Sequence, residues 1–87
     1  TAFCAGADLR GMIERGQGSL EQNVHDAEQL AALLLAIRDC PKPAIALVQG
    51  PAFGGGVGLA AACDVTVAGT EARFRLPEVQ LGIVPAV

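Results

Sequence analysis

One uncharged stretch, residues 44–63, constrains the fold of this chain more than any other part of the sequence. It begins with AIALV, an apolar run that is rich in β-formers and too short for a helix, which predicts a buried strand over residues 44–48. Gly50 and Pro51 predict that the strand ends before them and that a loop follows. After three consecutive glycines, small apolar residues predict a tightly packed helix over residues 55–63. The chain therefore passes from a strand into a helix at a run of glycines.

The glycine run favours a site for an anion, or for an oxygen that becomes one. Backbone N–H groups are unpaired where a helix begins, the helix dipole is positive there, and no side chain keeps a ligand away. Several motifs are excluded: no Lys-Ser or Lys-Thr follows as in a Walker A loop, Leu59 breaks the G-x-G-x-x-G fingerprint, and G-x-S-x-G is absent. Two alternatives stay open: the glycines form an oxyanion hole, or they only allow a helix to pack closely on a strand.

Composition and charge exclude several classes of function. With 87 residues, 52% of them hydrophobic, and a formal net charge of −3, the chain resembles a globular protein rather than a disordered or nucleic-acid-binding one. It has no basic stripe and neither Trp nor Tyr to stack on bases, so we expect no nucleic acid partner. Residues 44–63 are long enough to cross a membrane, but Pro51 and the glycines interrupt them, so we expect no membrane partner.

The three cysteines, Cys4, Cys40 and Cys63, form neither a disulfide framework nor a C-x-x-C metal pattern. An odd number of widely spaced cysteines is typical of a reducing compartment, so we expect a cytoplasmic protein without a metal site. We expect Cys40 and Cys63 to be small buried side chains.

The rest of the sequence alternates helical and strand patterns, which is typical of an α/β fold. The predicted elements are a strand that ends at residues 1–3, a helix over residues 9–15 capped by Asp8, a helix over residues 20–39 that begins with a capping box of Ser19 and Gln22, strands over residues 65–68 and 72–76, and a helical turn that begins at Pro77. The chain begins within a strand pattern and stops without a closing element, so we expect an internal fragment of a larger domain.

Several motifs, taken together in their order and spacing, resemble the enoyl-CoA hydratase/isomerase (crotonase) superfamily. They are FCAGADL at residues 3–9, GPAFGGG at 50–56, CD at 63–64, ARF at 72–74, PEV at 77–79 and LG at 81–82. The resemblance implies an α/β crotonase-like (ClpP/crotonase) fold with a core of ββα units. Residues 1–87 would then be a partial domain whose N- and C-terminal parts are missing. The resemblance also implies homo-oligomers, either trimers or hexamers.

The resemblance implies an acyl-CoA substrate and roles for particular residues. The backbone N–H groups of Ala7 and Gly55 would form the oxyanion hole for the thioester carbonyl, and Glu78 would move a proton at the acyl carbons. The alternative for Glu78 is an exposed first-turn carboxylate that only stabilises a helix dipole. The residues implied to bind the CoA thioester are Cys4, Ala5, Ala7, Asp8, Leu9, Phe53, Gly54, Gly55 and Gly58. No metal or separate cofactor is implied, because CoA is part of the substrate.

One position departs from the best-known hydratases, which carry a second glutamate three residues after the oxyanion glycine, where this chain has Gly58. The sequence around it, at residues 53–59 and 81–87, is most similar to hydratases of methylglutaconyl-CoA and related branched substrates. We therefore favour a hydratase that adds water to a 2-enoyl-CoA. The alternatives are a Δ3,Δ2-enoyl-CoA isomerase that uses a single glutamate and a non-catalytic acyl-CoA-binding member of the family.

Two further polar residues have competing interpretations. Arg75 stands where the family usually has a small residue, which makes it a candidate to contact a distal carboxylate of the substrate. The favoured alternative is that Arg73 and Arg75 share the outer face of a strand. His25 is the only histidine, and its polar neighbours favour a solvated helix face over a role as a general base.

Overall fold

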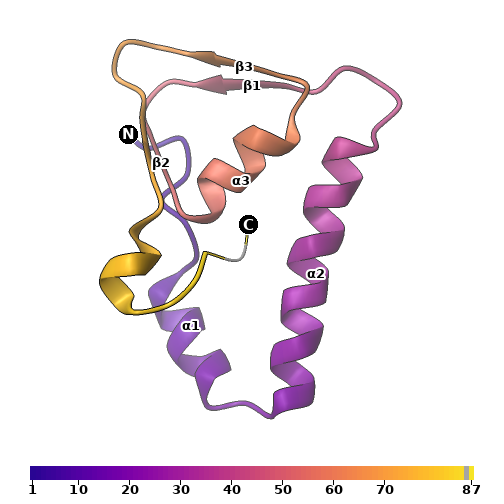
Figure 1. Ribbon diagram of the computed structural model, residues 1–87, viewed down its shortest axis with the longest axis vertical. Helices are drawn as coiled ribbons and strands as arrows, with labels where there is room; N and C mark the ends of the chain where they lie inside the picture. Colours follow the sequence, from indigo (N-terminus) through magenta and orange to yellow (C-terminus); the bar gives the residue numbers. More distant parts are fainter. Residues whose placement is uncertain (86) are drawn as a thin grey trace.

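The computed structural model describes residues 1–85 and 87, including all of their side chains except those of Leu9 and Arg15. The elements in chain order are α1 (Leu9–Gly16), α2 (Leu20–Arg38), β1 (Ile45–Val48), β2 (Pro51–Phe53), α3 (Gly55–Ala62), β3 (Val65–Ala68), β4 (Arg73–Arg75) and the 3₁₀ helix η1 (Pro77–Leu81). Figure 1 shows the long helix α2 along one side of the molecule, with α3 between it and the paired strands β1 and β3.

Both predicted helix caps at the N-terminal side are present. The Asp8 carboxylate accepts a hydrogen bond from the backbone N–H of Arg10 at 3.1 Å, and the Ser19 hydroxyl accepts one from the N–H of Gln22 at 3.1 Å. The reciprocal half of the capping box is wrong, because the Gln22 side-chain amide donates to the carboxylate of Asp26 at 3.1 Å instead. These caps fix where α1 and α2 begin.

The strands form two parallel pairs. In one pair β1 lies beside β3, with Ile45 opposite Val65 and Val48 opposite Ala68. In the other pair β2 lies beside β4, with Pro51 opposite Arg73. Parallel neighbours need a crossover connection, and in the first pair α3 provides it. The α/β class predicted from the alternating pattern is therefore confirmed for this part of the chain.

The prediction of a loop after Pro51 is wrong, because residues 51–53 form β2. Proline is acceptable at the first residue of a strand, and three residues are too few to show a period. The strand predicted to end at residues 1–3 is reduced to a single bridge between Cys4 and Ala52. The N–H groups of Phe3 and Cys4 both donate to the carbonyl of Pro51, at 2.9 and 3.2 Å.

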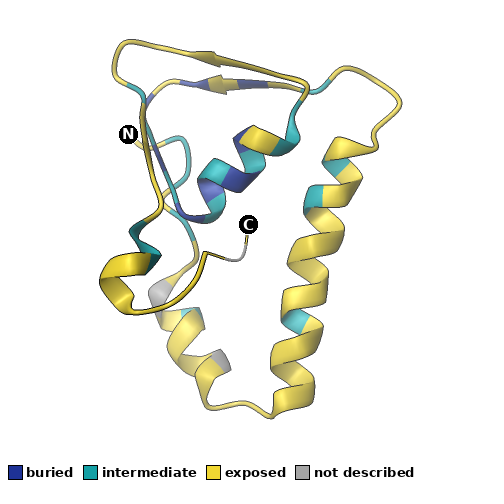
Figure 2. Ribbon diagram, in the orientation of Figure 1, coloured by how far each residue is buried: buried dark blue, intermediate teal, exposed yellow. Residues whose placement is uncertain are grey.

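The hydrophobic core is small and lies where α3 covers one face of β1. Figure 2 shows the buried residues gathered in β1, β2 and α3. The buried apolar side chains are those of Ala46, Val48, Ala52 and Ala60. The opposite face of the sheet is open, with Leu47 67% exposed. The prediction that Cys40 is buried is wrong, because the residue lies exposed in the connection after α2, while Cys63 is half-buried.

Three hydrogen bonds hold the C-terminal end of α3 and the residue pair that follows it against the sheet. The Asp64 carboxylate accepts from the N–H of Ala44 at 2.8 Å, and the Asp64 N–H donates to the Ala44 carbonyl at 2.9 Å. The Thr66 hydroxyl donates to the carbonyl of Ala60 at 3.1 Å. With its C-terminal end held in this way, α3 presents its N-terminal glycines at the other end.

None of the helices in residues 1–85 and 87 combines the length and the apolar character that a bilayer span requires.

Candidate active site

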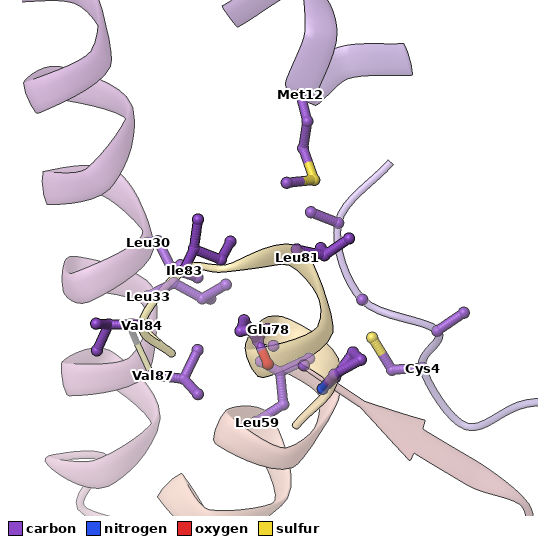
Figure 3. A pocket seen from close by; sticks show the side chains of 16 residues that line it. Cys4, Met12, Leu30, Leu33, Leu59, Glu78, Leu81, Ile83, Val84 and Val87 are labelled. Carbon is purple, nitrogen blue, oxygen red and sulfur yellow. The ribbon is translucent and has the colours of Figure 1, made fainter. Parts of the chain in front are cut away.

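A pocket of about 440 Å³ gathers segments that lie far apart in the sequence. Its walls come from the turn at residues 4–7, from the run of glycines at residues 54–56 between β2 and α3 (the glycine junction), from η1 with the segment after it, and from the facing sides of α1 and α2 (Figure 3). The lining residues are Cys4, Ala5, Gly6, Ala7, Met12, Leu30, Leu33, Gly54, Gly55, Leu59, Pro77, Glu78, Leu81, Ile83, Val84 and Val87.

The turn at residues 4–7 is held against the end of β2. The N–H of Phe53 donates to the carbonyl of Cys4 at 2.9 Å. Gly6 has a φ of 93°, and a Cβ on it would lie 3.2 Å from the carbonyl oxygen of Phe53. The positive φ therefore strains any other residue at this position, and the space for a side chain is tight. The next residue, Ala7, lines the pocket.

The three glycines of the junction have different physical reasons to be glycine. Gly54 has a φ of 56°, which other residues rarely adopt. A Cβ on Gly56 would lie 2.7 Å from the carbonyl oxygen of Cys4 and 2.8 Å from its Cβ, so this glycine lets α3 approach the turn closely. A Cβ on Gly55 would meet no atom within 4 Å. Close packing therefore explains Gly56 but not Gly55, which faces open space at the pocket.

We expect Gly56→Ala to destabilise the natural protein by about 1–3 kcal/mol, because the added methyl would overlap the backbone of Cys4, which cannot rotate away as a side chain can. Chemical denaturation measures the change. Gly16→Ala is the matched control, since a Cβ there meets nothing within 4 Å, and its effect should stay within about 0.5 kcal/mol. Equal stability of the two variants would show that the close approach is not a constraint.

Two backbone donors at the pocket are free. Within the described residues, neither the N–H of Ala7 nor that of Gly55 donates a hydrogen bond. Gly55 is the first residue of α3, so its N–H has no partner within the helix and lies at the positive end of the helix dipole. Both residues line the same pocket. The wall of one pocket therefore carries two residues with free backbone donors.

Glu78 brings a carboxylate to the same pocket. Its Oε1 lies 3.2 Å from where a Cβ on Gly54 would be, so the missing side chain at Gly54 makes room for it. Its Oε2 is buried and has no hydrogen-bond partner among the described residues. The backbone of Glu78 is fixed, since its carbonyl accepts from the N–H of Ile83 at 3.1 Å. The alternative of an exposed carboxylate at a helix end does not fit this burial.

An unpaired buried carboxylate oxygen is unfavourable unless a ligand or substrate supplies the missing partner. The rest of the pocket wall is mainly apolar, with Met12, Leu33, Leu59 and Leu81 among its members. The site therefore combines hydrogen-bond donors, one carboxylate and a hydrocarbon surface. This combination suits a molecule with a polar carbonyl and an apolar chain.

Five of the other residues proposed from sequence separate into two groups. Cys4 and Ala5 line the pocket beside Gly54. Asp8 is exposed and caps α1, and Phe53 lies half-buried at the end of β2, outside the lining. The last two proposed residues, Gly58 and Leu9, belong to neither group. Gly58 is buried within α3 and does not itself line the pocket, and the side chain of Leu9 lies outside the described residues.

The arginines lie away from the pocket. Arg75 is exposed on β4 and is not among the lining residues, while its backbone carbonyl accepts from the N–H of Gly54 at 2.9 Å. The Arg73 guanidinium donates to the carbonyls of Thr70 and Ala72 at 3.2 and 2.8 Å. The outer-face interpretation therefore fits better than contact with a substrate carboxylate. His25 is exposed, as its polar neighbours predicted.

Sequence reasoning missed most of the apolar wall. Leu30 and Leu33 reach the pocket from α2. This helix has no buried residue, and its many apolar side chains were the one sign in the sequence that it covers a pocket. Val84 and Val87 follow η1, and nothing in the local pattern places them at a pocket. The segment folds back because the N–H of Ile83 is bound to η1, a contact that appears only in three dimensions.

Comparison with known proteins places the whole chain in one group. A sequence model described as enoyl-CoA hydratase/isomerase matches residues 1–87. A solved enoyl-CoA hydratase/isomerase (crotonase) structure from Legionella pneumophila superposes with a TM-score of 0.91 at 52% sequence identity, covering 98% of this chain and 33% of that one. The crotonase-like fold expected from the motifs is therefore confirmed.

Two relatives found by sequence similarity carry names of the same family. A 2,3-dehydroadipyl-CoA hydratase of Escherichia coli is 50% identical over 84 residues, which is 95% of this chain and 31% of the relative. An enoyl-CoA hydratase of Alternaria alternata is 46% identical over 84 residues, which is 97% of this chain and 26% of the relative. The chain thus spans roughly a quarter to a third of the length of these proteins.

Proposed function

The chain belongs to the enoyl-CoA hydratase/isomerase family, and from this premise we propose that the protein is a hydratase that adds water to the double bond of a 2-enoyl-CoA thioester. The observation that carries the proposal is the content of one pocket. The free N–H groups of Ala7 and Gly55 and the unpaired carboxylate of Glu78 share an apolar cavity. Hydration of a thioester needs hydrogen-bond donors at the carbonyl oxygen and a carboxylate that can move a proton at the acyl carbons.

In the proposed reaction, the N–H groups of Ala7 and Gly55 bind the thioester carbonyl oxygen. Glu78 takes a proton from water while the water oxygen bonds to C3, and the electrons of the C2=C3 bond move toward the carbonyl oxygen. The resulting enolate is stabilised by the two donors, each worth about 10²–10³ in rate. C2 then takes the proton from Glu78, and the carbonyl is restored. The chemistry needs no cofactor besides the CoA of the substrate.

The apolar wall supports a hydrocarbon acyl chain, which gains free energy when it leaves water. Branched and glutaconyl-type chains remain within the proposal. Because the described part of the lining holds no Arg, Lys or His, a distal carboxylate would have to meet solvent or a cation from elsewhere. The name of the Escherichia coli relative indicates that such dicarboxylic substrates are used by a similar protein.

The second candidate is a Δ3,Δ2-enoyl-CoA isomerase, and Gly58 favours it. Glu78 is the one carboxylate among the described lining residues, and a single base is enough to move a proton from C2 to C4. A protein that only binds acyl-CoA is a third candidate. The buried, unpaired Oε2 atom of Glu78 argues against it, because a binding site for an apolar chain gains nothing from such an atom.

The proposal is tested by incubating the natural protein separately with a 2-enoyl-CoA, a 3-enoyl-CoA and 3-methylglutaconyl-CoA and identifying the products by mass. A product heavier by one water supports the hydratase. Conversion of the 3-enoyl thioester at constant mass, with a new conjugated double bond, supports the isomerase instead. Tight binding without any product would overturn both catalytic proposals.

The greater length of the relatives supports the further proposal that residues 1–87 form part of a crotonase-like domain. The trimeric or hexameric assembly expected from the resemblance stays a prediction, which light scattering of the natural protein would test.

A further inference from the structure

Gly58 and Val87 compete for the same space. A Cβ built on Gly58 would lie 2.8 Å from the Cβ of Val87, 3.2 Å from its Cγ1 and 3.6 Å from its Cγ2. Real side chains do not approach so closely, because repulsion between carbon atoms rises steeply below van der Waals contact. No side chain therefore fits at position 58 while Val87 keeps its place.

Position 58 lies directly behind the wall of the pocket. Gly58 follows Gly55 by three residues on α3, so the two lie on the same side of that helix. Gly55 lines the pocket, and so does Val87 (Figure 3), whereas Gly58 is buried beneath Val87. A side chain at position 58 would therefore project toward the pocket. In this chain the methyl groups of Val87 form the wall there.

We propose that Val87 determines specificity for the acyl group, because it fills the space that a side chain at position 58 would need. The proposal rests on the proposed function, since it takes the pocket to be the acyl-CoA site. Val87 puts an apolar surface where that side chain would stand, and it limits the room in this part of the proposed acyl site. The pocket then keeps Glu78 as its one carboxylate within the described residues and selects acyl chains by their bulk.

Two consequences distinguish a specificity role from general packing. First, Val87→Ala removes both Cγ methyls and should enlarge the pocket, so the affinity for a branched acyl chain should rise relative to a straight one. One methylene-sized change in an apolar pocket alters such a ratio by about 10-fold or more. Second, positions 58 and 87 should be coupled. Gly58→Ala should lower Tm by roughly 3–10 °C, and adding Val87→Gly should recover part of that loss.

The test uses the natural protein and two saturated thioesters, butyryl-CoA and isovaleryl-CoA, whose Kd values are measured by calorimetry so that no turnover is needed. The expected result is an about 10-fold change in the Kd ratio for Val87→Ala and none for Val79→Ala, a matched change at an exposed valine outside the lining. The Tm cycle is measured beside Gly16→Ala, which should show no coupling to Val87→Gly.

If both thioesters bind but the Val87→Ala ratio equals that of the wild type, the specificity role is overturned while the proposed function stands. If Gly58→Ala does not fold, the Gly58→Ala/Val87→Gly protein decides the coupling, and failure of that protein to fold also overturns it. If neither thioester binds the wild type, the pocket is not an acyl-CoA site, and the proposed function fails together with this inference.

Discussion

Glu78→Gln is expected to lower kcat by about 10²–10⁴-fold and to leave Tm unchanged or raised. Glutamine keeps the shape of the side chain but cannot take up and return a proton, which is the role proposed for the carboxylate. Because Oε2 is buried without a hydrogen-bond partner among the described residues, the wild type carries an uncompensated polar group that the neutral amide makes less unfavourable. A loss of activity without a loss of stability is typical of a catalytic group rather than a structural one.

The measurement compares kcat for a 2-enoyl-CoA with Tm from thermal unfolding, both in the natural protein. Glu71→Gln is the matched control, because Glu71 is exposed in the turn before β4 and does not line the pocket. It should change neither quantity. If Glu78→Gln kept more than about a tenth of the activity, proton transfer by this residue would be excluded.

The second large effect is expected at Gly55. Gly55→Pro should lower kcat by about 10²–10³-fold, which corresponds to roughly 3–4 kcal/mol, because it removes one of the two proposed oxyanion donors. The variant should still fold. Gly55 is the first residue of α3, where proline is well tolerated, and the preceding Gly54 has no Cβ to clash with the ring.

Gly55→Ala provides the comparison that isolates the N–H group. Alanine keeps the donor, and its Cβ would meet no protein atom within 4 Å, so stability should be unchanged or slightly higher. The methyl would instead occupy space beside the bound thioester. We therefore expect KM to rise more than kcat falls, whereas the proline variant should lose mainly kcat. A folded proline variant with normal turnover would show that Gly55 does not stabilise an oxyanion.

The parts of the fold that the sequence predicts well are those that local patterns encode. The strand at residues 45–48, the helix that opens at Gly55 and the caps at Asp8 and Ser19 all follow from composition and spacing over a few residues. β2 was missed because its three residues pair with β4, about twenty positions away, and such a pairing leaves no local period. Its opening Gly-Pro sequence also resembles a simple turn.

The candidate site also has a part that sequence motifs identify and a part that only the three-dimensional structure shows. The residues in motifs, Ala7, Gly55 and Glu78, were identified because the resemblance marks them, and the pocket brings them together. The apolar wall depends on how α2 and the segment after η1 fold onto the glycine junction, which no single stretch of sequence reports. The contact between Gly58 and Val87 joins residues that are far apart in the chain, so it appears only in the structure.

The most direct test of the central claim is a crystal structure of the natural protein with a saturated acyl-CoA bound. We expect the thioester carbonyl oxygen to lie about 2.7–3.1 Å from the backbone nitrogens of both Ala7 and Gly55. We also expect the acyl carbons to lie against the Glu78 carboxylate. A thioester bound elsewhere, or a carbonyl oxygen that contacts neither nitrogen, would contradict the assignment of this pocket as the active site.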